Sequence, residues 1–185
     1  MSVNATSKFD NLRQKYDFLF VIYYRGHWCP FCMAYLRVLQ DLSPTITSAG
    51  GCPVIISAQD EEHLAEVRSS SGYTGEAIND PENTLAKRLA ADGIITVAIT
   101  EWQGYPHGLA QPAILVIKKD GSVVETWAIV PSEMNLGGAK DRPDLHQVWE
   151  NINAKLNDKQ PSHARFSNQR ELDDLAKKFG VETQE

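Results

Sequence analysis

The fold is decided by residues 18–32, which read Phe18-Leu19-Phe20-Val21-Ile22-Tyr23-Tyr24-Arg25-Gly26-His27-Trp28-Cys29-Pro30-Phe31-Cys32. The first seven residues are apolar, β-branched or aromatic without a break, which is typical of a strand buried on both faces. A helix is predicted to begin at Pro30, because proline is favoured in the first helical turn, where its missing N–H is not needed. The stretch therefore predicts a strand that leads into a helix, with Cys29 and Cys32 at the junction.

The spacing of these cysteines predicts a redox-active dithiol. Residues at i and i+3 of a helical turn lie about 5–6 Å apart, within the range that a disulfide accepts. The positive end of a helix stabilises a thiolate, and there a thiol pKa can fall from about 8.5 to between about 3.5 and 7.5. Cys29, just before the first turn, is predicted to be the nucleophile. Cys32, one turn further on, is predicted to be the resolving thiol.

Two other uses of a Cys-x-x-Cys pair compete with the redox one. A structural zinc ion needs four ligands, but the sequence has no second such pair and no closely spaced pair of histidines. We therefore expect neither a metal nor a cofactor. An iron–sulfur or metal-binding protein is the alternative from another class, and a cluster would need an external thiol or a second subunit to complete its ligands.

Composition narrows the class of protein. The chain has 185 residues, of which 42% are hydrophobic and 23% charged, as in one ordinary soluble domain. Three cysteines are too few for a disulfide framework and indicate a reducing compartment. Residues 1–16 lack the features of a signal or transit peptide, and the longest apolar run, residues 18–24, is too short to cross a bilayer. A net charge of −6 with scattered lysines and arginines argues against nucleic acid. A cytoplasmic protein without a membrane partner is expected.

The order of the expected elements indicates an α/β fold with a central mixed sheet flanked by helices. Strands are predicted at residues 18–24, 53–57, 94–100, 112–117 and 122–130, and helices at 60–68, 80–91 and 143–156 in addition to the one that begins at residue 30. Pro44 should end or kink that helix, and residues 101–111 should form an irregular loop. Residues 1–157 are expected to form the domain, with the first 15 peripheral. Residues 158–185 are expected to be an arm with a short helix over 171–179.

Residues 23–32 resemble the active-site strand and turn of thioredoxin-like proteins. They are more closely similar to the peroxiredoxin-like branch grouped with alkyl hydroperoxide reductase and thiol-specific antioxidant proteins, and the likeness extends from about Phe18 to Leu156. The resemblance implies a thioredoxin-like fold in which Pro112 is cis and faces the cysteines, and in which the backbone of Gln111 pairs with an extended substrate. The expected substrate-binding residues are Trp28, Gln111 and Pro112. From the residues alone, a trans Pro112 that merely starts an edge strand is the better reading.

Two departures from the family pattern bear on the chemistry. Peroxiredoxins share a proline and a threonine or serine shortly before the reactive cysteine. In this sequence Ile22 and Gly26 stand at the corresponding positions. The second activating arginine of peroxiredoxins has no counterpart near residues 111–113. Three residues are supporting candidates. Arg25 offers a positive charge near Cys29, Tyr24 offers a route for a proton, and His107 is a loop histidine near Pro112.

The sequence thus predicts a thiol–disulfide oxidoreductase in which Cys29 attacks a substrate disulfide and Cys32 displaces the reduced product. The alternative is a peroxiredoxin-like peroxidase, in which Cys29 attacks a hydroperoxide and its sulfenic acid condenses with Cys32. Both readings need a cellular thiol reductant of the thioredoxin or glutathione type, and a homodimer stays open. Cys52, which has no near partner, is expected to be a buried hydrophobic residue.

Overall fold

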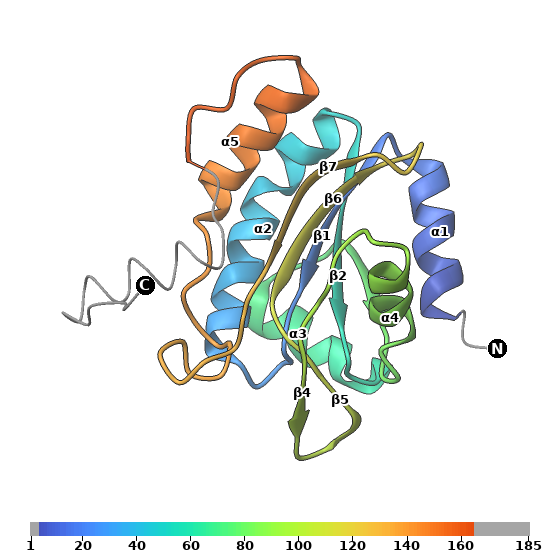
Figure 1. Ribbon diagram of the computed structural model, residues 1–185, viewed down its shortest axis with the longest axis vertical. Helices are drawn as coiled ribbons and strands as arrows, with labels where there is room; N and C mark the ends of the chain where they lie inside the picture. Colours follow the sequence, from blue (N-terminus) through green and yellow to red (C-terminus); the bar gives the residue numbers. More distant parts are fainter. Residues whose placement is uncertain (1–3, 165–185) are drawn as a thin grey trace.

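A computed structural model describes residues 4–164 of the chain. Its main sheet has the strand order β3-β2-β1-β6-β7 (Figure 1). The strands are β1 (Phe18–Tyr23), β2 (Gly51–Ser57), β3 (Glu76–Asn79), β6 (Ala113–Lys118) and β7 (Val123–Ala128). β1 pairs with β2 in parallel and with β6 antiparallel. The predicted mixed sheet of an α/β fold is therefore confirmed.

Helices cover both faces of this sheet (Figure 1). They are α1 (Ala5–Lys15), α2 (Pro30–Ser48), α3 (Leu64–Ser71), α4 (Thr84–Ala91) and α5 (Leu145–Leu156), with a short 3₁₀ turn, η1, at Glu61–His63. Alternate residues of β1 point to opposite faces. Phe18, Phe20 and Ile22 pack with α2 and α5, whereas Leu19, Val21 and Tyr23 pack with α1 and α4. Two apolar layers thus explain why β1 has no polar face.

The N-terminal segment is not peripheral, so that expectation is wrong. Residues 5–15 form α1, in which Phe9 and Leu12 are 1% and 7% exposed. These two residues lie three apart on an otherwise polar helix, which places both against the sheet. Arg88 of α4 also binds the carboxylate of Asp10 through two hydrogen bonds of 2.7 and 2.9 Å. The first helix is therefore part of the layer that covers one face.

The region after α4 differs most from expectation. A two-stranded sheet, β4 (Ile99–Trp102) with β5 (Tyr105–Ala110), replaces the predicted strand at 94–100 and the predicted loop at 101–111. The hairpin closes through Gln103 and Gly104, and Gly104 has a φ of +86°, which a residue without a Cβ adopts without strain. The short strand β3 was also not predicted.

Pro44 does not end its helix, because α2 continues to Ser48. The proline is exposed to solvent, so water can reach the backbone carbonyl that its missing N–H leaves unpaired. The helix expected over residues 171–179 lies outside the described residues. Within residues 4–164, none of the helices combines the length and the hydropathy that a membrane crossing requires.

The side chain of Asp80 anchors the start of α4. Its buried carboxylate accepts hydrogen bonds from the backbone N–H groups of Thr84, Leu85 and Ala86 and from the Thr84 hydroxyl. These bonds satisfy the free donors in the first turn of α4. We expect Asp80→Ala to lower the free energy of unfolding by about 2 kcal/mol, measured by urea denaturation. Replacing the exposed Glu82 by Ala should change it by less than about 0.5 kcal/mol, and equal losses in the two variants would contradict this role.

Candidate functional site

The two cysteines lie where the sequence predicts, at the junction of β1 and α2. Cys29 is the N-cap residue of α2, and its Sγ accepts a hydrogen bond of 3.4 Å from the backbone N–H of Cys32. Pro30 follows as the first helical residue. Both cysteines are free thiols, and their residues are 1% and 0% exposed. The strand-to-helix turn therefore buries two adjacent sulfurs at the positive end of a helix.

An arginine that the sequence analysis missed completes this pair. The Nη2 of Arg142 donates a hydrogen bond of 3.1 Å to the Sγ of Cys32 and lies 3.9 Å from the Sγ of Cys29. The same nitrogen binds the carbonyl oxygen of Ala139 at 2.9 Å, and the guanidinium lies over the ring of Tyr35. Arg142 comes from the segment between β7 and α5, more than 100 positions from either cysteine. No local sequence signal marks such a contact.

The surroundings make the two sulfurs unequal in acidity. Burial by itself would raise the pKa of Cys32, but the hydrogen bond with Cys29 and the charge of Arg142 outweigh burial and lower that pKa to about 6. The backbone N–H of Arg25 also binds the Cys32 sulfur, at 3.3 Å. The hydrogen bond to Cys32, followed by burial, raises the pKa of Cys29. These surroundings therefore favour the thiolate of Cys32 over that of Cys29.

This distribution differs from the sequence expectation of a thiolate on Cys29. The helix N-terminus acts on both sulfurs, whereas the side chain of Arg142 and the backbone of Arg25 are directed at Cys32. The assignment of Cys29 as the attacking sulfur remains a prediction. It requires the proton shared by the two sulfurs to move from Cys29 to Cys32 before attack.

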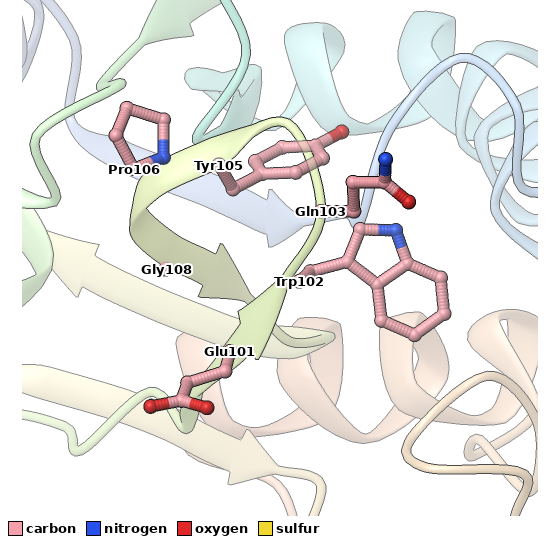
Figure 2. A pocket seen from close by; sticks show the side chains of 6 residues that line it. All are labelled: Glu101, Trp102, Gln103, Tyr105, Pro106 and Gly108. Carbon is pink, nitrogen blue, oxygen red and sulfur yellow. The ribbon is translucent and has the colours of Figure 1, made fainter.

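Trp28 belongs to a cluster of aromatic rings beside the cysteines. Its ring stacks on that of Trp102 with centroids 5.2 Å apart and planes 3° apart. Its Nε1 donates a hydrogen bond of 2.8 Å to the hydroxyl of Tyr105. Trp102 and Tyr105 project to the same side of the β4–β5 hairpin (Figure 2). The hairpin thus closes over the residue that precedes Cys29.

Gly26 explains one departure from the peroxiredoxin pattern. A Cβ at this position would lie 2.6 Å from Trp28 Nε1 and 2.7 Å from the Tyr105 hydroxyl. Such contacts are too short for a threonine or a serine, the residues that the peroxiredoxin pattern has at this position. The close approach of the aromatic cluster to the backbone therefore requires glycine.

The expectation of a cis proline is wrong, because the peptide bond before Pro112 is trans. The backbone N–H of Gln111 is already paired with the carbonyl of Ala98 at 2.8 Å. Its side chain is buried and donates to the hydroxyl of Thr100. Pro112 is a trans proline directly before β6, which is what the residues predict without the family resemblance. Since its N–H is occupied, Gln111 cannot donate that group to an extended substrate.

The remaining candidate residues differ in how they are placed relative to Cys29 and Cys32. Tyr24 is buried in the same apolar cluster as both cysteines, and burial raises its pKa to about 12. His107 is exposed and lines a cleft with Trp28, but no described contact joins it to either sulfur. Cys52 is buried at the start of β2, and burial raises its pKa to about 11. Its burial agrees with the sequence expectation.

One cluster of possible metal ligands lies among the described residues. The ligand atoms of His27, His63 and Glu66 lie within 4.8 Å of one another. Gln59 accepts from the backbone N–H of His27, so its amide nitrogen faces Nδ1 of the same ring at 2.7 Å. Nδ1 must then accept, and in neutral His27 the proton sits on Nε2, which faces Glu66 at 3.6 Å. The rings of His27 and His63 are also stacked rather than convergent. The contact of Nδ1 with Gln59 and the stacking of the two rings therefore do not favour a metal ion here.

Comparison with known proteins agrees with the fold. Peroxiredoxin 6 of Arenicola marina, in a cysteine-to-serine mutant, has a TM-score of 0.61 at 16% identity over 80% of this chain, which spans 64% of that protein. AhpC of Mycobacterium bovis has a TM-score of 0.60 at 13% identity, covering 82% of this chain and 76% of that one. The peroxidoxin BcpB of Mycobacterium tuberculosis has a TM-score of 0.58 at 14% identity, covering 81% and 84%. No curated protein matches the sequence significantly.

A family model gives the more specific result. The AhpC/TSA family model matches residues 3–126, a segment that holds Cys29, Cys32, the aromatic cluster and most of the main sheet. The expected membership of the peroxiredoxin-like branch is therefore confirmed. With its two buried thiols at the end of β1, the chain belongs to the AhpC/TSA family and is a peroxiredoxin-like oxidoreductase.

Proposed function

We propose that this chain is a thiol-dependent peroxidase that reduces small hydroperoxides with Cys29 and Cys32 and ends each cycle with a disulfide between them. The observation that carries the proposal is the buried sulfur pair with Arg142 bound to Cys32 at 3.1 Å. A guanidinium favours the thiolate that attack on a peroxide needs. The burial of both sulfurs admits a small hydroperoxide more readily than the disulfide of a folded protein.

The family and the structural relatives support the same chemistry. The relatives are named as peroxiredoxin 6, AhpC and a peroxidoxin, and the family carries the name AhpC/TSA. We propose a thiol reductant of the thioredoxin or glutathione type for this chain, since a disulfide must be reduced after every cycle.

The proposed cycle balances with the residues present. The proton moves from Cys29 to the Cys32 thiolate, and the Cys29 sulfur then attacks the terminal oxygen of the hydroperoxide. The O–O bond breaks, and the alkoxide leaves as an alcohol by taking the proton from Cys32. The Cys32 thiolate next attacks the sulfenic sulfur of Cys29, and hydroxide leaves as water with a proton from solvent. One hydroperoxide has then been reduced by two electrons, which came from the two thiols.

Thiol–disulfide exchange is the second candidate, favoured by the Cys-Pro-Phe-Cys spacing that thiol–disulfide oxidoreductases use. In the described structure, however, the backbone N–H of Gln111 is bound to Ala98. That leaves no donor at this position for pairing with a protein strand. If exchange occurs here, we expect it with small disulfides.

The test is a single-turnover reaction of the fully reduced protein with one equivalent of tert-butyl hydroperoxide. We expect one tert-butanol for each Cys29–Cys32 disulfide mapped by mass spectrometry. In a parallel reaction, bis(2-hydroxyethyl) disulfide should react at least about 100-fold more slowly, because its sulfur atoms, each flanked by a second sulfur and a carbon chain, must reach a buried thiolate. Faster reaction with the disulfide, or peroxide loss without the mapped bond, would overturn the peroxidase assignment.

A further inference from the structure

Arg142 reaches the sulfurs from a segment that no helix or strand holds in place. Residues 129–144 connect β7 with α5, and they form neither kind of element. Connecting segments of this kind are generally more mobile than the elements that they join. A guanidinium favours a thiolate strongly only at close range, because the attraction between the two charges falls with distance. Contacts from outside the segment are therefore needed to keep Arg142 beside Cys32.

The hydrogen bonds of the guanidinium do not fix its orientation. Its Nη2 donates to the carbonyl oxygen of Ala139 at 2.9 Å and to the Cys32 sulfur at 3.1 Å, and it lies 3.9 Å from the sulfur of Cys29. Among residues 4–164, Nε and Nη1 of Arg142 are buried and have no hydrogen-bond partner. All of these polar contacts pass through one nitrogen, so they leave the planar group free to turn about it.

Tyr35 supplies contacts that restrict this movement. It follows Cys32 by three residues on α2, which makes the two side chains neighbours on one face of the helix. The Cζ of Arg142 lies 5.3 Å from the centroid of the Tyr35 ring, within the range of a cation–π contact. The Tyr35 hydroxyl donates a hydrogen bond of 2.8 Å to the carbonyl oxygen of Pro143, the residue after Arg142. One side chain thus binds both the cation and the backbone next to it.

We propose that Tyr35 is a positioning residue that holds the Arg142 guanidinium against the Cys32 sulfur. Successive turns of α2 present first the sulfur and then the ring, and the arginine contacts both. The segment that carries the arginine lies beside the first turns of α2 (Figure 1). Tyr35 is half-buried and packs against the apolar cluster that includes both cysteines. The inference deepens the proposed peroxidase function and rests on it for the reaction that the thiolate performs.

The first arm of the test measures the acidity of the sulfur pair without turnover. Tyr35→Leu removes the ring and the hydroxyl, and it should raise the midpoint of the thiolate absorbance at 240 nm by at least about 0.5 pH units. Tyr35→Phe keeps the ring and should recover at least about half of that shift. Val38→Ala, one turn further along α2 and also half-buried, is the matched control and should leave the midpoint within about 0.2 units. An unchanged midpoint in a folded Tyr35→Leu protein would overturn the proposal.

The second arm asks whether Tyr35 acts through the arginine. In the Arg142→Met protein the guanidinium is gone, so adding Tyr35→Leu should move the midpoint by less than about 0.2 units. A shift of the same size with and without Arg142 would show that Tyr35 affects the sulfurs by another route. That outcome would overturn the positioning role.

A comparison that preserves shape keeps the test decisive if Tyr35→Leu fails to fold. Phenylalanine and pentafluorophenylalanine at position 35 are similar in shape, but fluorine withdraws negative charge from the face of the ring. The pentafluoro protein should have a midpoint at least about 0.3 units above that of Tyr35→Phe, because its ring no longer attracts a cation. Equal midpoints in these two proteins would contradict the contact between the ring and the guanidinium.

The last arm connects acidity with turnover of tert-butyl hydroperoxide. With a Cys32 pKa of about 6, the rate of Tyr35→Leu should be at least about twofold below that of the unmodified protein at pH 6 and equal to it above about pH 8.5. A loss by the same factor at both pH values would overturn the positioning role and leave the peroxidase standing. The expected shift in absorbance, seen in a protein that does not reduce the hydroperoxide, would support the positioning role and overturn the peroxidase.

Discussion

Replacing Cys29 by serine is expected to lower the rate of hydroperoxide reduction by at least about 1,000-fold, because the attacking sulfur is lost. Replacing Cys32 by serine should instead leave a single turnover. In that variant one equivalent of peroxide is consumed, and a sulfenic acid stays on Cys29 because no second thiol condenses with it. Peroxide consumption with ferrous xylenol orange and dimedone labelling with peptide mapping measure the two outcomes.

The control for both variants is Cys52→Ser. Cys52 is buried at the start of β2, and burial raises its pKa to about 11, so its loss should change the rate by less than about twofold. The opposite pattern, a dimedone adduct on Cys32 in the Cys29→Ser protein, would reverse the roles. It would make the more acidic sulfur of the pair the attacking one.

Replacing Arg142 by methionine is expected to move the ionisation of the sulfur pair to higher pH. At pH 7 a thiol with a pKa of about 6 is about 90% ionised, and an increase of two pKa units would reduce this fraction to about 9%. The peroxidase rate at pH 7 should then fall about tenfold. Because the pKa is lowered in the native protein, activity should be retained above pH 6 and lost as the pH falls below it.

Thiolate absorbance at 240 nm, recorded against pH, measures this shift directly. The midpoint should lie near pH 6 in the unmodified protein and at least one unit higher in Arg142→Met. Arg142→Lys keeps the charge but not the planar donors, and its midpoint should lie between the two. Arg37→Met, on the exposed side of α2, should leave the midpoint in place. An unchanged midpoint in Arg142→Met would show that this arginine does not set the acidity.

The features that the sequence predicts correctly are those that depend on neighbouring residues. The apolar run at 18–24 and the proline at 30 define the strand, the helix and the placement of both cysteines. The hairpin of β6 and β7 follows from its Asp-Gly turn in the same way. Each of these depends on fewer than about ten consecutive residues, within which periodicity and turn chemistry act.

The features that the sequence does not reveal depend on contacts between distant segments. Arg142 reaches the cysteines from 113 and 110 residues away, and Trp102 stacks on Trp28 from another hairpin. The cis form of Pro112 was expected from the resemblance alone and is absent, whereas the trans alternative followed from the residues. Arg25 was expected to offer a charge near Cys29. The structure directs its backbone to Cys32 and its side chain to the two tryptophans.

The position of Arg142 along the chain has a consequence for proteins that share this family. The family model covers residues 3–126, so the two thiols lie inside the shared segment, and the guanidinium that helps to lower the pKa of Cys32 lies beyond it. The shared segment therefore includes the turn that holds the sulfurs but not the arginine that affects how readily Cys32 loses its proton. Two relatives with the same Cys-x-x-Cys turn can differ widely in reactivity at a given pH, according to what their chains supply after the last strand of the sheet.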